Sequence, residues 1–325
     1  PSHSAKQRMI SDRIDYFVDQ VPKQADFLEE VITGLSKSQK AIPPKFFYDE
    51  IGSHLFDKIC ETPEYYIADT EISLLKEIGW EISELAGASR IVIEFGCGSG
   101  LKTSALLTLL EEPSEYLAID ISRVHLLHTV TEIAKAFPRI RVGALCADFS
   151  DLLELPKQVI RSGNSRFAFF PGSTIGNLAP IDVQIFLNQM RSIVGVGGAF
   201  LIGVDIKKDK SILDAAYNDA AGYTEAFNLN LLYRMKNELD AKIEIDAFRH
   251  RAFYHEQKAR VEMHLVSARD QVISVGGIDF EISKDETIHT ENSYKFTVAE
   301  FSNLANKSGF KVIKAWVDSE NLFSI

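Results

Sequence analysis

Cysteine is scarce in this chain: Cys60, Cys97 and Cys146 are the three cysteines among 325 residues, and none belongs to a C-x-x-C pair. This usage excludes a disulfide framework and is typical of a reducing compartment, so we expect a cytoplasmic location. The sequence also lacks an apolar run long enough to span a bilayer, and its first residues lack the hydrophobic stretch of a signal peptide. We therefore expect no membrane partner and no secretion.

An excess of basic charge is also lacking. The 35 lysines and arginines are outnumbered by 46 aspartates and glutamates, which gives a net charge of −11. Such a chain has no surplus of cations to displace the counterions of a polyanion, so we expect no nucleic-acid partner. What is abundant is hydrophobic sequence, 46% of the residues, enough for one large domain or two ordinary ones. We expect a monomer that acts on a small molecule.

The most informative motif is a glycine-rich loop that follows an apolar strand. The segment Ile91–Phe95 runs into Gly96-Cys-Gly98-Ser-Gly100, and a helix is predicted to begin there. Glycines allow a sharp turn at the end of the strand and the close approach of a ligand. The dinucleotide fingerprint G-x-G-x-x-G would need a glycine where Leu101 stands. The match to E-x-G-x-G-x-G, the adenosylmethionine loop of Rossmann-like methyltransferases, is better, although such a loop is also found in ordinary strand-to-helix turns.

Two further strands end in acidic residues that suit an adenosine ligand. Tyr116–Asp120 is predicted as the second strand, and Asp120 stands where a ribose hydroxyl needs an acceptor. An N-cap for the helix that begins near Ser122 is the alternative for this residue. The third predicted strand, 140–146, leads to Asp148 and Phe149, which could hold an adenine amino group and ring. A capping aspartate followed by a core phenylalanine is the alternative there.

Strands and helices alternate through the middle of the chain. Further strands are predicted over 167–170 and 199–204, with helices at periodic apolar positions such as Val183, Phe186, Leu187 and Met190. This alternation predicts an α/β fold with a parallel, doubly wound sheet, whose ligand crevice lies at the carboxyl ends of the strands.

The pattern changes between about residues 206 and 295. A helical stretch over 214–235 is followed by strands predicted over 259–266 and 271–282, which indicates an inserted antiparallel unit. A helix over 297–308 and strands over 311–317 and 322–325 then close the sheet with a hairpin. We expect a methyltransferase-like domain over 70–206 and 296–325, and a smaller α+β substrate-binding domain over 1–69 and 207–295.

A series of ordered motifs resembles one known family, the histidine Nα-methyltransferases that make trimethylhistidine (hercynine) in ergothioneine biosynthesis. The likeness spans nearly the whole chain. The motifs are Phe47-Tyr48-Asp49, Gly52-Ser53-x-Leu55-Phe56-Asp57, Thr62-Pro-Glu-Tyr65-Tyr66, the loop at Gly96, Pro171-Gly172-Ser173-x-Ile175-Gly176-Asn177, Tyr217-Asn-Asp219, Glu262-Met263 and Thr290-Glu291-Asn-Ser293-x-Lys295-Phe296. One departure is Gly100, where relatives usually carry a polar residue.

The resemblance implies S-adenosylmethionine as methyl donor, a Rossmann-like class I methyltransferase sheet, and a second domain formed by the N-terminal segment and the insertion. It also implies two sets of site residues. The donor contacts are Tyr48, Gly96, Lys102, Asp120, Asp148 and Phe149, and the histidine contacts are Tyr65, Asn177, Tyr217, Met263, Glu291 and Ser293.

The residue types suit methyl transfer from a sulfonium, which needs a neutral amine placed in line with the methyl carbon and little covalent help. We hypothesise that Asn177 and Tyr217 orient the amine and the carboxylate of the substrate, and that the proton leaves through water. Taken alone, Asn177 could be a helix cap or turn residue, and Tyr65 and Tyr217 could be half-buried packing residues.

Specificity for histidine is assigned to Glu291 and Ser293, which share one face if their segment is extended and could pair with the two imidazole nitrogens. Met263 could equally be core or a wall against the ring. Lys102 could reach the donor carboxylate or be a solvated lysine. His125 and His128 have a metal-compatible spacing but no attached carboxylate or cysteine cluster, so no metal is expected.

The sequence therefore predicts an adenosylmethionine-dependent enzyme that methylates the α-amino group of L-histidine, three times in succession. The alternatives are the same chemistry on another amino acid, such as a tryptophan derivative, and a noncatalytic sensor or scaffold that binds adenosylmethionine. A nicotinamide oxidoreductase is disfavoured by Leu101.

Overall fold

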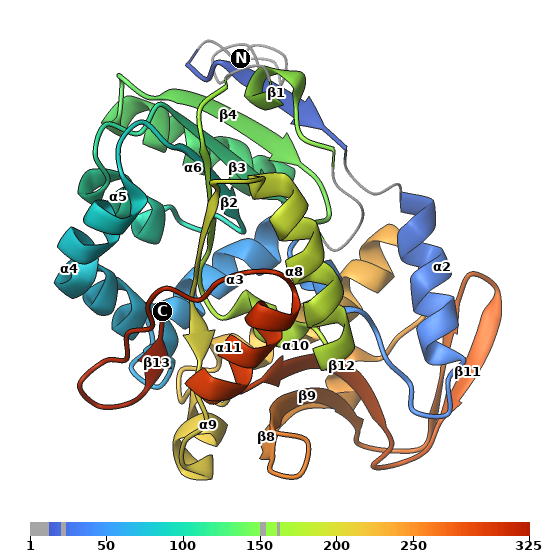
Figure 1. Ribbon diagram of the computed structural model, residues 1–325. Helices are drawn as coiled ribbons and strands as arrows, with labels where there is room; N and C mark the ends of the chain where they lie inside the picture. Colours follow the sequence, from blue (N-terminus) through green and yellow to red (C-terminus); the bar gives the residue numbers. More distant parts are fainter. Residues whose placement is uncertain (1–12, 21–23, 150–153, 161–162) are drawn as a thin grey trace. The chain divides into compact units, whose positions relative to one another are not determined.

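The structure, a computed structural model, describes residues 13–20, 24–149, 154–160 and 163–325. The chain divides into two compact units, coloured along the sequence in Figure 1. Unit 1 comprises the described residues of Pro1–Val21, Ile67–Ile206 and Phe296–Ile325, and unit 2 those of Pro22–Tyr66 and Lys207–Lys295.

Unit 1 is built on a six-stranded parallel sheet in the order β1-β4-β3-β2-β5-β6. The inner strands are apolar and almost wholly buried, as expected of a parallel sheet that is covered on both faces. The chain leads from β2 outward to β3 and β4 and returns to β5 on the other side of β2, so the topological switch point lies between β2 and β5. The strands are β1 (Tyr16–Asp19), β2 (Ile91–Phe95), β3 (Glu115–Asp120), β4 (Arg141–Cys146), β5 (Arg166–Phe170) and β6 (Ala199–Ile202).

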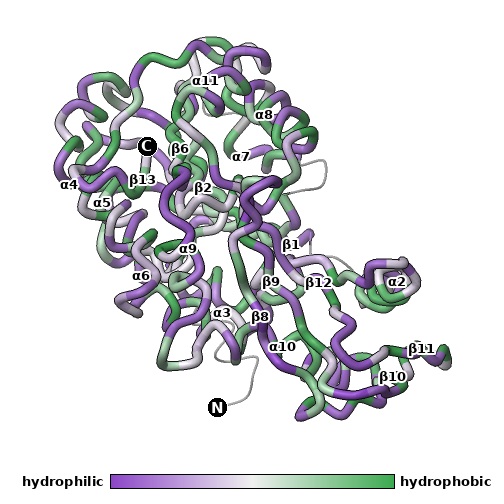
Figure 2. The backbone as a smooth tube through the Cα atoms, turned by 90° about the horizontal axis from the view of Figure 1, so that it is seen from below, coloured by the Kyte–Doolittle hydropathy of each residue, from purple (hydrophilic) through white to green (hydrophobic). Residues whose placement is uncertain are grey.

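Amphipathic helices flank this sheet (Figure 1). In α8 (Pro180–Val194), the predicted periodic residues Val183, Phe186, Leu187 and Met190 are buried, and Figure 2 shows hydrophobic and hydrophilic residues alternating along this helix. The remaining helices of unit 1 are α4 (Tyr66–Ala86), α5 (Leu101–Leu109), α6 (Arg123–Ala136), α7 (Lys157–Ile160) and α11 (Val298–Lys307). The predicted α/β class and doubly wound parallel sheet are thereby confirmed.

Strand β1 corrects one predicted boundary. Residues 1–69 were assigned to the substrate-binding domain, but Tyr16–Asp19 pairs in parallel with β4 at the edge of the unit 1 sheet. The ring of Tyr16 lies over Gly143, where a Cβ would come within 2.1 Å of it, and the Arg141 guanidinium lies 5.6 Å from its centroid. This pairing joins residues far apart in the sequence, so a four-residue strand gives little local signal.

The C-terminal part of unit 1 also differs from expectation. The strand predicted over 199–204 is interrupted at Gly203, where a Cβ would stand 1.8 Å from Glu71 Oε2. It resumes as β7 (Val204–Asp205), which pairs antiparallel with β13 (Phe323–Ser324). The strand predicted over 311–317 is wrong, because this mostly exposed segment forms only an isolated bridge, between Val317 and Ser324.

Unit 2 contains the predicted antiparallel insertion, with a three-stranded sheet in the order β12-β9-β8. Its strands are β8 (Phe248–His255), β9 (Arg260–Ser267) and β12 (Thr287–Tyr294), of which β9 was predicted as a strand, β8 was not, and β12 was considered only as an extended segment around residues 291–293. The run 271–282, predicted as one strand, is a hairpin of β10 (Gln271–Val275) and β11 (Ile278–Ile282). Gly276 and Gly277 both have positive φ, which permits this two-residue turn.

Helices from both chain segments of unit 2 contribute to its core. The helix predicted over 214–235 is broken into α9 (Lys210–Ala216) and α10 (Tyr223–Glu238), because the Asp219 carboxylate accepts from the amides of Tyr223 and Thr224 and starts a new helix. Phe227 of α10 stacks on Phe47, with centroids 4.4 Å apart. Phe47 ends η1 (Pro44–Phe47); the other elements are α2 (Gln24–Leu35), α3 (Glu50–Cys60) and η3 (Ile245–Ala247).

The structure also describes the cysteines and the longest helices of the chain. Cys60, Cys97 and Cys146 are all free thiols in the structure. Among the described residues, no helix combines the length and apolar character needed to traverse a bilayer.

Candidate active site

The glycine-rich loop in unit 1 leaves open space at the carboxyl end of β2. Gly96, Gly98 and Gly100 all have positive φ, a conformation that costs glycine little. A Cβ built at Gly96 or Gly98 would meet no atom within 4 Å, whereas one at Gly100 would lie 3.0 Å from Thr129 Cγ2. Gly100 is also the N-cap of α5. The first two glycines therefore allow a ligand to approach, and the third allows close packing of the helix.

Asp120 stands at the end of β3, beside this loop. Its Oδ1 accepts a hydrogen bond from the amide of Ser122 at 3.1 Å, and the Cys97 thiol lies 3.8 Å from Oδ2. Burial raises the pKa of Asp120, and the backbone N–H groups of Ser122, Ile121 and Gly98 oppose this shift. The N-cap of α6 is Ser122, so Asp120 is not the cap that the alternative proposed.

Asp148 and Phe149 follow β4, the next strand along the sheet. Asp148 is buried, and the half-buried ring of Phe149 packs against Phe95 and Phe170 with centroids 6.0 and 5.5 Å away. Phe149 is therefore partly a core residue, as the alternative proposed, and the rest of its ring is accessible. Three strand ends, β2, β3 and β4, bring Gly96, Asp120, Asp148 and Phe149 to one edge of the sheet.

A buried carboxyl group that the sequence analysis passed over lies next to these residues. Glu94 is inaccessible to solvent, and its Oε1 accepts hydrogen bonds from the hydroxyls of Thr103 and Tyr116. Burial raises its pKa to about 7, and the two hydroxyl donors hold it back from rising further. Its other oxygen, Oε2, has no hydrogen-bond partner among the described residues. The signal was present in the sequence, because Glu94 is the acid of the E-x-G-x-G motif.

Lys102, in the first turn of α5, is neither solvated nor isolated. Its Nζ lies 2.8 Å from Oε1 of Glu71, a carboxyl group that is fully buried in α4. The same oxygen accepts from the amide of Gly172 at 2.8 Å. Gly172 follows β5, so Lys102 stands at the switch point between β2 and β5. Its contact with the donor stays a prediction.

Asn177 also follows β5, at the end of the short helix η2 (Thr174–Asn177). The N-cap of the next helix, α8, is Ala179, so Asn177 does not cap it. Ser173 precedes η2 and holds the backbone at its start. It has a φ of +56°, and its hydroxyl accepts a hydrogen bond from the amide of Asp205 at 2.8 Å.

In unit 2, three of the six predicted histidine contacts, Met263, Glu291 and Ser293, lie on one face of the β12-β9-β8 sheet. Glu291 pairs with Met263 across β12 and β9, and Ser293 pairs with Val261. Residues directly opposite one another point to the same side, and so do residues two apart along a strand. The segment is therefore extended, and Glu291, Ser293 and Met263 share one face. A bulge between His289 and Glu291 sets this register.

The carboxyl group of Glu291 changes its charge near physiological pH. Burial raises its pKa to about 7, and the positive charge of Lys295 limits the rise. A carboxyl group in this state can accept a hydrogen bond as the anion or donate one as the acid.

Lys295 is the functional candidate that the prediction missed. It is 1% exposed, and its Nζ donates to the hydroxyl of Tyr217 at 2.9 Å and to Ser293 Oγ at 3.0 Å. The Tyr217 hydroxyl lies 3.0 Å from the same Oγ and donates to it. The three side chains form a buried triangle at one side of Glu291. The available signal was the alternation of Glu291, Ser293 and Lys295, which places all three on one face.

Aromatic rings surround this triangle within unit 2. The rings of Tyr65 and Tyr217 meet edge to face with centroids 6.0 Å apart, and burial raises the pKa of Tyr65. Tyr65 in turn contacts Phe56, which also contacts Tyr48. Tyr48, predicted to contact the donor, thus lies in an aromatic cluster of unit 2, whereas the other donor candidates lie in unit 1.

Among the residues that the structure describes, His125 and His128 are not part of a group with metal-ligand geometry. His125 is buried in α6 and His128 is exposed. Within the described ranges, the group with metal-ligand geometry is a different one, Glu262 with His264 and His289 of unit 2.

A parallel sheet that reverses at β2, with a glycine-rich turn after β2 and acids after β3 and β4, defines a nucleotide-binding site of the class I methyltransferase type. The sequence family described as "Histidine-specific methyltransferase, SAM-dependent" matches residues 27–325. The chain belongs to this family.

Individual relatives agree with the assignment. The histidine N-alpha-methyltransferase of Mycobacterium tuberculosis is 34% identical, with 91% of this chain and 92% of the relative covered. The protein of the same name from Mycolicibacterium smegmatis is 35% identical over the same shares. Ergothioneine biosynthesis protein 1 of Neurospora crassa is 27% identical over 85% of this chain and 32% of its own length. The chain is thus an enzyme that uses S-adenosylmethionine.

The residues at the sheet edge fit this cofactor. The open space over Gly96 and Gly98 allows a bulky ligand to approach the backbone, and Asp120 offers a carboxylate at the position suited to a ribose.

Proposed function

We propose that this chain transfers methyl groups from S-adenosylmethionine to the α-amino nitrogen of L-histidine. Membership of a histidine-specific family supports the substrate, and the chemistry of unit 2 supports it independently. The proposal includes three successive transfers, which would give trimethylhistidine. One relative is named for ergothioneine biosynthesis, the pathway on which trimethylhistidine lies.

The proposal rests on one hydrogen-bond donor, Ser293, and one acceptor, Glu291, which lie on the same face of the β12-β9-β8 sheet. Ser293 Oγ accepts from both Tyr217 and Lys295, so both of its lone pairs are used and its own proton must point away from them. Glu291, two residues away on the same face, supplies an acceptor. A neutral imidazole has one N–H donor and one nitrogen acceptor, which matches this pair. An indole has only the N–H and would leave the Ser293 donor unsatisfied.

The bound cofactor supplies an activated methyl group, and the chain supplies position. The attacking amine must be neutral and about 3 to 3.5 Å from the methyl carbon. The α-amino group has a pKa of about 7.7 to 8.0 in model peptides and a somewhat higher one in a free amino acid, so the enzyme must take the neutral minority or the amine must lose its proton on binding. Asn177 and Tyr217 are the residues proposed to orient the amine and the carboxylate. The Lys295 ammonium fixes the Tyr217 hydroxyl, and the released proton leaves through water.

The remaining contacts are proposed from the same family position. Gly96, Lys102, Asp120, Asp148, Phe149 and Tyr48 would hold the methyl donor, and Tyr65, Met263, Glu291 and Ser293 would surround the imidazole. We also propose that the enzyme works as a monomer in the cytoplasm, with a small amino acid as its partner.

One incubation tests the proposal. The purified chain is mixed with S-adenosylmethionine and a panel of free amino acids, including tryptophan derivatives, and the products are weighed by mass spectrometry. Histidine should gain one, two and finally three methyl groups. Methylation of another amino acid with histidine unchanged would overturn the substrate. Histidine binding in calorimetry without any mass gain would support a noncatalytic role instead.

A further inference from the structure

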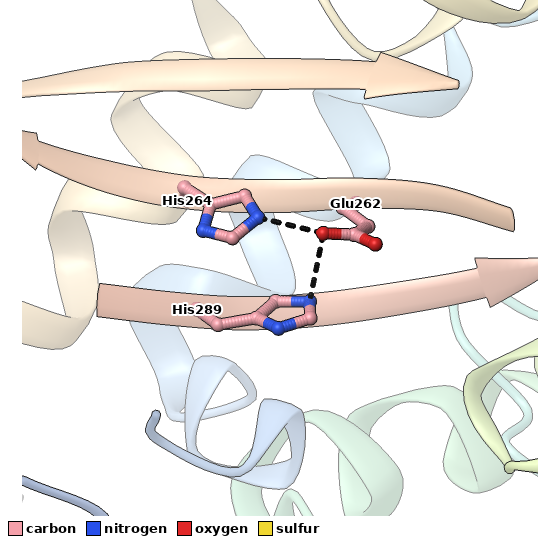
Figure 3. A group of neighbouring side chains, drawn as sticks. All are labelled: Glu262, His264 and His289. Atoms are coloured by element: carbon pink, nitrogen blue, oxygen red, sulfur yellow. Dashed lines mark hydrogen bonds and ion pairs between the residues drawn. The ribbon is translucent and has the colours of Figure 1, made fainter. Parts of the chain in front are cut away.

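The face of the β9–β12 pair opposite Met263 and Glu291 carries three metal-ligating side chains. His264 of β9 stands directly across from His289 of β12, and Glu262 lies two residues before His264 on the same face. Figure 3 shows the three side chains converging from the two neighbouring strands. None of them belongs to the site proposed above.

The distances among the ligand atoms approach those of a metal centre. Glu262 Oε1 lies 2.9 Å from His264 Nε2 and 4.0 Å from His289 Nε2, and one atom from each of the three residues lies within 4.8 Å of the others. A tetrahedral zinc ion bound at about 2.0 to 2.1 Å places its ligand atoms about 3.3 Å apart. The Glu262–His289 separation exceeds this spacing, so binding of an ion requires the His289 side chain to move toward Glu262.

The surroundings orient the ligands as outer-shell partners do. The Thr287 hydroxyl lies 2.9 Å from His264 Nδ1, so the opposite nitrogen of this ring faces Glu262. Phe253 stacks on the His264 ring with an interplanar angle of 9°, which limits its rotation. Such partners fix the ring and the tautomer of a metal-binding histidine.

The charges select the kind of ion. Arg260 Nε lies 2.9 Å from Glu262 Oε2, which leaves Oε1 for a ligand but neutralises the carboxylate. Hard cations such as Ca²⁺ and Mg²⁺ bind oxygen-rich, anionic sites, whereas Zn²⁺, Co²⁺ and Ni²⁺ bind imidazole well. Two imidazoles and one partly neutralised carboxylate favour the second group.

We infer that Glu262, His264 and His289 form a binding site for a divalent transition-metal ion of the zinc type. Three protein ligands leave a fourth position for water or a small ligand. The site competes with an existing contact, because His289 Nε2 lies 3.1 Å from the backbone carbonyl of Glu291. Binding of the ion would replace that hydrogen bond.

The test uses the full chain after treatment with a chelator. Zinc chloride is titrated by calorimetry into wild type, His264→Gln and His289→Gln, with His128→Gln as the matched control because His128 is exposed and lies in unit 1. We expect one ion per wild-type chain and per control chain. Loss of either ligand should weaken binding by more than about 100-fold, since even outer-shell changes cost 10- to 100-fold.

A second readout separates a lost site from a misfolded protein. Circular dichroism should be the same for all four proteins, and zinc should raise the melting temperature of wild type and His128→Gln alone. With cobalt, the visible spectrum should indicate nitrogen and oxygen ligands without thiolate. The inference is overturned if wild type binds no zinc, if binding is unchanged in both ligand variants, or if cobalt reports thiolate ligands.

Discussion

Asp120 in unit 1 ends a parallel strand and is held largely by the backbone, whereas Ser293 in unit 2 lies within a strand and is held by other side chains. The carboxylate of Asp120 has backbone N–H groups around it. Ser293 lies between Tyr217 and Lys295. Backbone support survives most substitutions nearby, but support by side chains does not. We therefore expect unit 2 to be the more sensitive to single changes around the site.

The largest expected effect is that of Glu291→Ala on histidine binding. The substitution removes a hydrogen bond to a charged group, which is worth about 1.5 to 3 kcal/mol, or about a 10- to 150-fold loss of affinity. The affinity for S-adenosylmethionine should hardly change. Calorimetric titration of each ligand measures both, with Glu281→Ala, an exposed glutamate of β11, as the control. Unchanged histidine affinity in Glu291→Ala would refute the assignment.

The converse change is Asp120→Ala in unit 1. We expect the affinity for S-adenosylmethionine to fall by about 1 to 2 kcal/mol, or about 5- to 30-fold, because the variant loses an acceptor for the ribose. Histidine affinity, measured without donor, should be retained. Asp182→Ala, which changes the first turn of α8, serves as the control. A variant that lost histidine binding as well would contradict the division of roles between the two units.

Histidine affinity should also depend on pH through Glu291. With a pKa of about 7, this group is about one-tenth ionised at pH 6 and about nine-tenths ionised at pH 8. If the carboxylate accepts the imidazole N–H, affinity should rise about tenfold over this interval. Titration of histidine itself adds to the observed change, so the profile of Glu291→Gln is subtracted. Identical profiles for wild type and Glu291→Gln would contradict the expectation.

Glu291 should make the folded state less stable as pH rises, which is opposite to the expected rise in histidine affinity. Because burial raises the pKa of Glu291 above its usual value of 4.5, the folded state binds this proton more tightly than the unfolded state does. The contribution of this group is therefore fully present below about pH 4.5 and is lost as pH rises through 7. Glu291→Gln should remove that part of the pH dependence of the free energy of unfolding.

The smallest expected effect on affinity is that of Lys295→Met. The variant keeps the shape of the side chain but loses two hydrogen bonds to hydroxyls, so histidine affinity should fall by about 0.5 to 1.5 kcal/mol, or about 2- to 13-fold. The pKa of Glu291 should rise, because Lys295 lowers it in the wild type. The midpoint of the pH profile would then move to higher pH. The control is Lys258→Met, an exposed lysine.

A merely structural role for Lys295 would give a different result. If Lys295 only stabilised the fold, removal of this one charged member of a buried cluster would mainly lower the stability of the protein. A Lys295→Met protein that is at least as stable as wild type, yet binds histidine with a shifted pH midpoint, would support positioning. An unshifted midpoint would contradict it.

Unit 1 was the more predictable unit because its signals are local. Each inner strand is a short apolar run, and the acid or glycine that matters comes directly after it, as Gly96 does after β2 and Asp120 at the end of β3. The failures there involve partners far away in the sequence. β1 is recognised only through its pairing with β4, and the break at Gly203 only through the carboxylate of Glu71.

In unit 2 the sequence predicted the shared face of Glu291 and Ser293 but not what surrounds it. Lys295 was visible within a motif, yet its burial against Tyr217 depends on a residue 78 positions away. The facing of His264 and His289 depends on the register of β9 and β12, which no local pattern specifies. Strand β8 was missed entirely.

The bulge in β12 gives this strand one more residue than its partner β9 has over the same stretch. Thr290 is the extra residue between His289, which pairs with His264, and Glu291, which pairs with Met263. Its hydroxyl is anchored 2.8 Å from Asn228 Oδ1 and 3.1 Å from the carbonyl of Met263. In a regular strand, residues two apart face the same side, so without the bulge the imidazole of His289 and the carboxylate of Glu291 would share one face. The additional residue lets His289 and Glu291, two apart in the sequence, face opposite sides of the sheet.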